Sequence, residues 1–183
     1  NSYRTAIGYK ASTTGTAATA VGSFNRAVGE RSFAGGYEAS ALANDSVAIG
    51  SKAQSTQVGG VALGSGAVAS TAGGIVGYDA STGTTAAAGT AIANTKSTLG
   101  AVSVGDAANG QFRQITGVAA GSEDSDAVNV SQLKAVADGA AAGATHFYSV
   151  GSTDAKAGNY NNDGAPGSTR LAAGGGESTT PAR

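Results

Sequence analysis

The chain lacks cysteine and contains almost none of the other side chains on which enzyme sites depend. Among its 183 residues there are no Cys, two Pro and one His. The absence of cysteine excludes disulfides, thiol catalysis and Cys-based metal sites. No Ser or acidic pattern around the single histidine, His146, indicates a catalytic triad, so we interpret it as a surface or interface residue. We therefore expect no enzyme activity, and we predict no catalytic residues, no cofactor and no metal.

Large apolar residues are also scarce. Val, Ile, Leu and Phe together make up about 15% of the chain, which is less than an ordinary hydrophobic core needs. No apolar run reaches the roughly 18 residues of a membrane-spanning helix, so we predict no membrane contact by this chain. Disordered chains combine such a composition with high net charge, whereas here the formal charge is −1 and glycines recur regularly. We expect an ordered, repetitive protein with no nucleic-acid partner.

A glycine recurs in near-constant register through the first part of the chain. The stretch Asn44-Asp45-Ser46-Val47-Ala48-Ile49-Gly50-Ser51 has relatives before and after it, with steps of 14, 14, 14, 14 and 13 residues between successive glycines. The aligned glycines are Gly8, Gly22, Gly36, Gly50, Gly64 and Gly77. A phase held through six copies indicates a repeat protein.

The columns of the repeat predict which way the side chains point. Small residues, mostly Ala, stand two and four places before each glycine, and aliphatic residues often stand one and three places before it. Such a period of two predicts a short strand with two buried faces, the small face lining a narrow interior. A 14-residue coil then closes as two short strands joined by tight bends. Stacked coils pair their strands in parallel, which predicts an all-β fold, a flattened parallel β-roll or solenoid.

The aliphatic column predicts a seam between subunits. It forms an apolar stripe on the outside of the roll, and an exposed stripe of that length is a partner-binding surface. With so small an interior the roll is not expected to stand alone, so we infer self-association along the stripe. The predicted interface residues are Ile7, Val21, Val47, Ile49, Val61, Leu63, Val76, Val102 and Val104, with Val130 and Leu133 farther along the chain.

The register blurs between Asp79 and Ala101. Ala91-Ile92-Ala93 resembles a repeat shifted by two residues, and Val102-Ser103-Val104-Gly105 restores the phase. Because Gly77 and Gly105 are 28 residues apart, we predict two irregular coils here, with a small loop near Ser81–Thr85.

A different composition begins after residue 105. Asn129 followed by Gln132 resembles a capping box, and the apolar spacing after it predicts a helix. The acidic residues just upstream, Glu123, Asp124 and Asp126, suit a helix N-terminus better than a cation site. Gly139 and Gly143 weaken this helix, so we interpret it as one strand of a short coiled coil.

The order of these motifs resembles one family. The Ser-Val-Ala-Ile-Gly repeats, then Arg113-Gln114-Ile115-Thr116, then Asp126-Ala127-Val128-Asn129-Val130-Ser131-Gln132-Leu133, are similar to a YadA-like head followed by its neck in trimeric autotransporter adhesins. The resemblance covers about residues 1 to 145. Gly35 in place of an aliphatic residue, Asn25 in place of Ala, and the blurred stretch 79–101 depart from the pattern.

The resemblance implies an assembly and a location. It implies a homotrimer of left-handed parallel β-rolls at residues 1–105, a neck and short coiled-coil helix at 106–145, and a connector with a truncated second head at 146–183. The family is found on the surface of Gram-negative bacteria, anchored in the outer membrane through a C-terminal barrel that we expect to lie outside this fragment. Family heads attach to host cells or matrix proteins such as collagen, fibronectin or laminin.

Other functions compete with that of an adhesin head. Basic residues could form ridges on the outer strand, but Glu30 and Glu38 lie among them and indicate a mixed solvated surface, so no ligand-binding residue is assigned. The basic residues are Lys10, Arg26, Arg31 and Lys52. A hexapeptide-type acyltransferase would repeat every six residues, and an ice-binding solenoid would show a ladder of threonines. A passive spacer that projects other domains shares every feature with an adhesive head and stays open.

Overall fold

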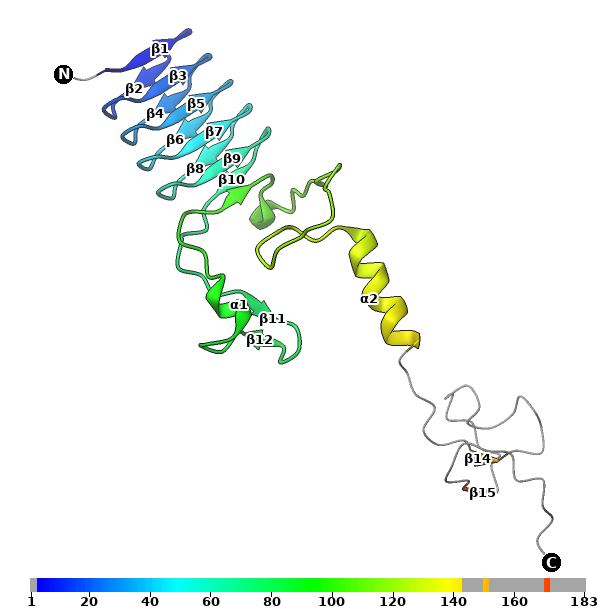
Figure 1. Ribbon diagram of the computed structural model, residues 1–183. Helices are drawn as coiled ribbons and strands as arrows, with labels where there is room; N and C mark the ends of the chain where they lie inside the picture. Colours follow the sequence, from blue (N-terminus) through cyan, green and yellow to red (C-terminus); the bar gives the residue numbers. More distant parts are fainter. Residues whose placement is uncertain (1–2, 143–149, 152–169, 172–183) are drawn as a thin grey trace, which may run out of the picture. The chain divides into compact units, whose positions relative to one another are not determined.

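The chain divides into two compact units in its computed structural model, which describes residues 3–142, 150–151 and 170–171. The units are Asn1–Thr116 and Gly117–Arg183. The first unit contains a stack of coils, each built from one strand in each of two parallel sheets (Figure 1). Sheet A consists of β1 (Thr5–Ile7), β3 (Thr19–Val21), β5 (Phe33–Gly35), β7 (Val47–Ile49), β9 (Val61–Leu63) and β13 (Val102–Ser103). Sheet B consists of β2 (Ser12–Thr13), β4 (Arg26–Ala27), β6 (Ser40–Ala41), β8 (Gln54–Ser55) and β10 (Val68–Ala69).

The register of the sheets is that of the sequence repeat. Ala34 pairs with Ala20 on one side and with Ala48 on the other, so each residue lies beside its equivalent 14 positions away. Sheet B follows the same rule, with Ala27 beside Ala41. The predicted parallel β-solenoid of 14-residue coils is therefore confirmed.

The interior of the roll is filled almost entirely by alanine. Alanines of sheet A and sheet B point toward one another and are fully buried, as predicted for the small face of each strand. In the described part of the chain, the largest fully buried side chains are Asn25, Ser32, Ser46 and Ser55. Asn25 stands in a column that is otherwise alanine, and its Nδ2 donates to the Ala34 carbonyl at 3.1 Å. A core of this composition contributes little hydrophobic free energy per coil.

A left-handed residue recurs at the bends every seven positions, which is half the length of the sequence repeat. One residue in every seven has a left-handed backbone, with φ between 54° and 68°. These residues are Lys10, Ala17, Phe24, Arg31, Glu38, Asp45, Lys52, Gly59 and Gly66. From Phe24 onward, the N–H of each donates to a carbonyl of the preceding coil, as Phe24 N–H does to Tyr9 at 2.8 Å. Each coil therefore has two equivalent bends, although their side chains share no chemistry.

The stretch 79–101 does not form two irregular coils, and this prediction was wrong. Strand β13 pairs directly with β9, Val102 beside Val61, so Gly105 follows Gly64 in the stack. Residues 70–101 instead form a projection (Figure 1) with an antiparallel hairpin, β11 (Tyr78–Asp79) and β12 (Thr84–Thr85), and a short helix, α1 (Ala91–Asn94). The shifted repeat expected at 91–93 is this helix, because the Thr90 side chain caps it by accepting from the Ala93 N–H at 3.2 Å.

Asp79 explains why the hairpin turns where it does. Its carboxylate accepts from the Ser81 N–H at 2.9 Å and from the Ser81 hydroxyl at 2.6 Å. These hydrogen bonds close the turn and hold the pKa of the Asp79 carboxyl below its ordinary value. The small loop expected near Ser81–Thr85 is the tip of this hairpin and strand β12.

The second unit contains the predicted helix, α2 (Val130–Ala142), and its capping box is present. The Gln132 N–H donates to Asn129 Oδ1 at 3.1 Å, and the Asn129 N–H donates to Gln132 Oε1 at 3.2 Å. The same two side chains also hold the preceding loop: Asn129 Nδ2 donates to the Val118 carbonyl at 3.2 Å, and Gln132 Nε2 to that of Gly121 at 2.9 Å. Together the two amides fasten the loop to the first turn of the helix.

One of the acidic residues before α2, Asp126, plays a different part from the one expected. Asp126 accepts from the N–H groups of Ser122 at 2.9 Å and Glu123 at 3.1 Å, and so closes its own turn. These hydrogen bonds lower the pKa of the Asp126 carboxyl. The first turn of α2 contains no acidic residue, so its N-terminus is capped by Asn129 and not by the acids.

Replacing Asn129 by Ala is expected to destabilise the helix by about 1 kcal/mol, because both the cap and the bond to Val118 are lost. Thermal unfolding of α2, followed by far-ultraviolet circular dichroism at fixed protein concentration, measures the change. Lys134→Ala, on the exposed side of the same helix, is the matched control and should be nearly neutral. An equal loss in the two variants would contradict the capping role.

Beyond α2 the structure describes one antiparallel pair, β14 (Val150–Gly151) with β15 (Arg170–Leu171). The other predictions for the tail, including His146 and the truncated second head, lie outside the described residues. Within the described ranges there is no helix long and apolar enough to cross a membrane, and no group of three or more metal-ligating side chains.

Candidate functional site

The outer face of sheet A is an apolar surface that nothing in the described part of the chain covers. In sheet A the residue after the central alanine of each strand points outward, and in four of the first five coils it is a large aliphatic side chain. Ile7, Val21, Ile49 and Leu63 keep between 39 and 60% of their surface exposed. Val102 continues the face on β13 and is 67% exposed. Isolated exposed aliphatics are ordinary, but a continuous row across a sheet indicates an interface.

A second row of apolar side chains lies beside the first. Phe33, Val47 and Val61 stand three places before the key glycines and are half-buried on the same face. Phe33 explains the departure at Gly35, because a Cβ at Gly35 would lie 2.9 Å from the Phe33 ring. The ring therefore takes the place of the missing aliphatic side chain, and the face is continuous from β1 to β13.

The structure brings together most of the predicted interface residues. The eight residues found on sheet A or directly after it are Ile7, Val21, Val47, Ile49, Val61, Leu63, Val102 and Val104. Val76 does not belong to this column, because it lies in the projection, and Val104 holds the place after Leu63. Val130 and Leu133 lie in α2, in the other unit, and are both exposed. Sequence reasoning omitted Phe33 from the set, although its position in the aliphatic column identified it.

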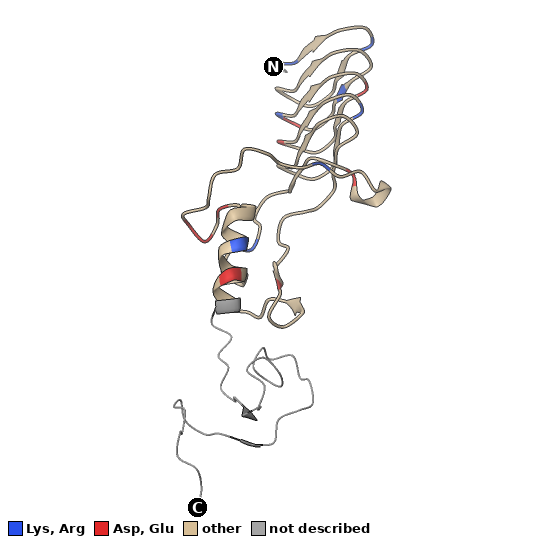
Figure 2. Cartoon of the chain, turned by 90° about the vertical axis from the view of Figure 1, so that its right-hand side faces the viewer, with Lys and Arg blue, Asp and Glu red and all other residues tan. Residues whose placement is uncertain are grey.

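The opposite face of the roll is polar. Along sheet B the outward residues are Ser12, Arg26, Ser40, Gln54 and Val68. Apart from Arg26, the charges of the coils lie at the bends and not on the strands, as Figure 2 shows. The roll therefore has one apolar face, one polar face and charged corners.

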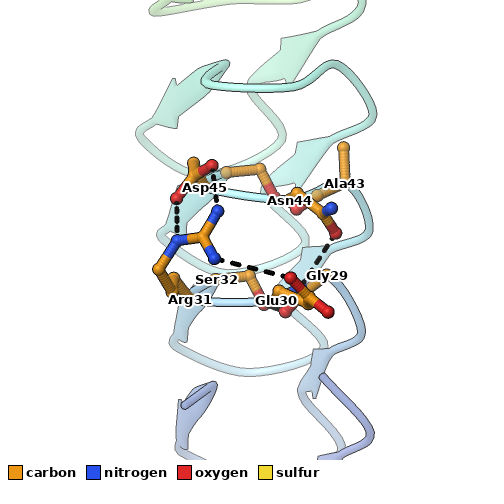
Figure 3. Close-up of polar contacts among 8 residues, drawn as sticks. Gly29, Glu30, Arg31, Ser32, Ala43, Asn44 and Asp45 are labelled. Atoms are coloured by element: carbon orange, nitrogen blue, oxygen red, sulfur yellow. Dashed lines mark hydrogen bonds and ion pairs between the residues drawn. The ribbon is translucent and has the colours of Figure 1, made fainter. Parts of the chain in front are cut away.

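One corner joins the third and fourth coils by polar side chains (Figure 3). Arg31 donates from Nε to Asp45 Oδ1 at 2.6 Å and from Nη2 to Asp45 Oδ2 at 2.8 Å. This pair lowers the pKa of the Asp45 carboxyl, and Asn44 Oδ1 accepts from the Glu30 N–H at 3.0 Å. Both partners are largely exposed, so the ion pair contributes modestly.

The other corner is partly aromatic. Tyr9, Phe24 and Tyr37 lie on three successive coils and contact edge to face, with ring centroids 5.2 and 5.9 Å apart. Lys10 Nζ lies 5.4 Å from the Tyr9 centroid. Farther along this corner Lys52 lies 3.9 Å from Glu38. The expected mixed surface is confirmed, because Arg31 and Lys52 pair with acidic residues instead of forming a basic ridge.

Arg113 closes the last coil of the roll. Its guanidinium donates to the backbone carbonyls of Val104 and Ser65 and lies against Gly64. A further coil would otherwise satisfy carbonyls at this end. Val102, Val104 and Phe112 line a shallow open groove beside it. Phe112 is 78% exposed, so apolar surface continues past the end of sheet A.

Parts of the chain are similar to known proteins of one kind. Residues 114–156 match the family described as the coiled stalk of trimeric autotransporter adhesin. The chain is 74% identical over 46 residues, or 25% of its length, to the trimeric autotransporter adhesin AtaA of Acinetobacter sp. (strain Tol 5). Over these segments the chain is similar to trimeric autotransporter adhesins. A second such adhesin, the autotransporter adhesin BadA of Bartonella henselae, is 71% identical over 41 residues, or 22% of the chain.

The chain corresponds to a small piece of these adhesins, since each match spans 1% of the relative's length. Among solved structures it is similar to the C-terminal YadA-like domain of a Burkholderia pseudomallei protein, with 42% identity, a TM-score of 0.39, and coverage of 54% of this chain and 44% of that one. It is also similar to the collagen-binding domain of the Yersinia adhesin YadA, with 19% identity, a TM-score of 0.27, and coverage of 75% and 99%. Adhesins of this family are exposed on the cell surface and anchored in the outer membrane.

Proposed function

We propose that this adhesin chain forms part of a head in which three copies pack their sheet A faces around a common axis, and that the outer surface of the trimer attaches to host cells or extracellular matrix proteins. The observation that supports this most strongly is the apolar outer face of sheet A above a core made of alanine. A single roll leaves its largest aliphatic side chains in water and buries only its smallest ones.

Burial of the outer face supplies the free energy that the interior lacks. Each half-exposed Val, Ile or Leu contributes roughly 1 kcal/mol when the rest of its surface is removed from water. Five coils and β13 repeat this contribution along the face, in each of three chains. A closed trimer with rotational symmetry buries every copy of the face and leaves none exposed.

Helix α2 supports the same assembly. Val130, Leu133 and Val136 are 73, 64 and 69% exposed and recur at a spacing of three residues along the helix. A helix of 13 residues with an uncovered apolar side is marginal in water. Three such helices, packed side by side as a short coiled coil, would cover these residues.

Ile49→Asp is expected to convert the trimer into monomers, because three carboxylates would be buried against one another at the seam. Light scattering across a dilution series measures the mass, which should be that of three chains for the wild type and one for the variant. Gln54→Asp, which adds the same charge to the exposed outer face of β8, should leave the mass unchanged. A wild-type chain that is a folded monomer would contradict the proposed assembly.

The surface left outside such a trimer is mostly polar. Sheet B and the charged corners are presented three times, so weak contacts to an extended partner act together. The family supports matrix proteins such as collagen, fibronectin or laminin as ligands. Binding of the wild-type trimer to each immobilised protein, compared with the Ile49→Asp monomer, tests this. Saturable binding that weakens in the monomer is expected.

A passive spacer is the second candidate. The outward row of sheet B favours it, because Ser12, Arg26, Ser40, Gln54 and Val68 repeat no common chemistry along the coils. A stable trimer that binds none of the matrix proteins, and no host cells, would favour the spacer over the adhesive head.

A further inference from the structure

We propose that residues 70–101, the projection, form a clasp that packs against a neighbouring copy of this chain and extends the trimer seam beyond the roll. This inference depends on the trimer proposed above and adds a second contact to it. The projection is the one departure from regular coil geometry among the described coils of the roll, and the roll does not need it.

The projection is an addition to an otherwise complete stack. The connection from a strand of sheet B to the next strand of sheet A is five residues long in the preceding coils, as at residues 56–60 between β8 and β9. Between β10 and β13 the same connection is 32 residues long. Val102 nevertheless pairs with Val61 in the ordinary register, so the insertion leaves the ladder intact.

The two legs of the projection are fastened to each other, which makes it a defined element. The Ala101 N–H donates to the Thr71 carbonyl at 3.0 Å, Gly74 to Ser97 at 2.7 Å, and Ala86 to Gly77 at 3.0 Å. The hairpin of β11 and β12 closes its far end. Backbone pairing of this kind holds the shape but buries almost no apolar surface.

Large apolar side chains in the projection are left mostly exposed by the residues that the structure describes. Of residues 70–101, only Ala86 is buried, whereas Ile75, Tyr78 and Leu99 are 56, 67 and 66% exposed. A two-stranded hairpin with such short strands is marginal in water unless it packs on something larger. A surface supplied from outside the chain would therefore stabilise it.

The projection has few charges and is continuous with the outer face of sheet A. These two features identify a second copy of this chain as the surface that covers it. The projection contains only two charged residues, Asp79, which already accepts from Ser81, and Lys96. Depletion of charge is typical of the buried part of an interface. Leu99 lies against Gly59 and leads within three residues into Val102 on the outer face of sheet A. The apolar surface of the projection thus runs directly into the face that we assign to the trimer seam.

Excision of the projection tests the clasp, and the chain supplies its own replacement. In the variant, residues 70–101 are replaced by a copy of residues 56–60, Thr-Gln-Val-Gly-Gly, which restores an ordinary coil. We expect the circular dichroism of the roll to be kept, and the concentration at which half the trimers dissociate to rise at least about tenfold. The double variant Ile75→Ser, Leu99→Ser should shift it in the same direction. Val68→Ser, on the outer face of β10, is the control and should not.

A photoreactive residue provides a second, direct readout. A benzoyl-phenylalanine placed at Tyr78 should form crosslinks between chains in the purified protein, and the same residue at Ser40 on sheet B should not. Crosslinks confined to one chain, or a wild-type dissociation curve in both the excised and the double variant, would overturn the clasp while leaving the trimer in place. If excision leaves the trimer unchanged but abolishes matrix binding, the projection is a ligand contact and the clasp is wrong. A monomeric wild type would instead refute the proposed assembly itself.

Discussion

Gly50→Ala is expected to abolish the folded roll. Gly50 has a φ of +127°, a conformation open almost only to glycine, and an added Cβ would lie 2.5 Å from the carbonyl carbon and 2.7 Å from the carbonyl oxygen of Gly64. Those atoms belong to the backbone of the next coil and cannot rotate away. The backbone strain alone costs about 1–3 kcal/mol, and the overlap adds to it, so the loss should exceed about 4 kcal/mol.

Substitutions at two other glycines separate the effect of backbone strain from that of steric overlap on the stability of the roll. Gly74→Ala keeps an unfavourable φ, +88°, but meets no atom within 4 Å, so it should show the conformational cost alone. Gly139→Ala in α2 also meets nothing and should stabilise the helix by about 0.5–1 kcal/mol. Chemical denaturation at one protein concentration ranks the three variants. A Gly50→Ala protein as stable as Gly74→Ala would show that the coils are spaced more widely than the structure has them.

Ala48→Leu is expected to be nearly as damaging, for a different reason. Ala48 is fully buried between the two sheets, and its neighbours in the ladder, Ala34 and Ala62, are fully buried as well. Three additional carbon atoms would have to be accommodated where the sheets are joined by short bends at both edges. Overpacking in ordinary cores costs about 1–3 kcal/mol, and we expect the upper end of this range or more.

A graded series distinguishes overpacking from loss of a favourable contact. Stability should fall in the order Ala48, Ala48→Val, Ala48→Leu, while Ala135→Leu on the exposed side of α2 should be nearly neutral. Thermal unfolding at fixed concentration measures the order. If Ala48→Leu were tolerated, the narrow interior could not explain why the large aliphatic residues lie on the outside.

The part of the fold that sequence predicted best is the part where neighbouring coils constrain one another. Ala34, Ala48 and Ala62 lie in one ladder, so a larger residue at any one of them would push on the next. Because every position of the ladder therefore requires a small residue, the alanine column can be recognised in a single sequence. The apolar outer face was predicted from the same alternation, since a residue next to a buried alanine must point outward. Its role as a seam remains a prediction.

The projection could not be predicted because its sequence imitates a coil. In Ile75-Val76-Gly77 an aliphatic residue stands directly before the glycine, as in a genuine repeat, and the glycine is one residue out of step. What decides the matter is that β13 takes the hydrogen-bonding edge of β9, and this pairing joins residues 41 positions apart. Local patterns contain no information about which of two similar segments will occupy an edge.

The seven-residue period of the bends was invisible for another reason. Lys10, Ala17, Phe24 and Arg31 share a left-handed backbone but no side-chain property, because their side chains point into solvent. For residues other than glycine, the left-handed conformation costs about 1 kcal/mol or more in free energy. From Phe24 onward the N–H at each bend is held by the coil before it, so the ladder imposes these bends and local preference does not.

Each coil of the ladder contacts only its neighbours. The length of the head therefore changes by whole coils. Duplicating one 14-residue unit would insert a coil that fits both of its new neighbours and would lengthen the head by one strand spacing, about 4.8 Å. The gain or loss of any whole 14-residue unit would leave the remaining coils in register. A population of cells could thus carry heads of several heights that share one cross-section and one assembly.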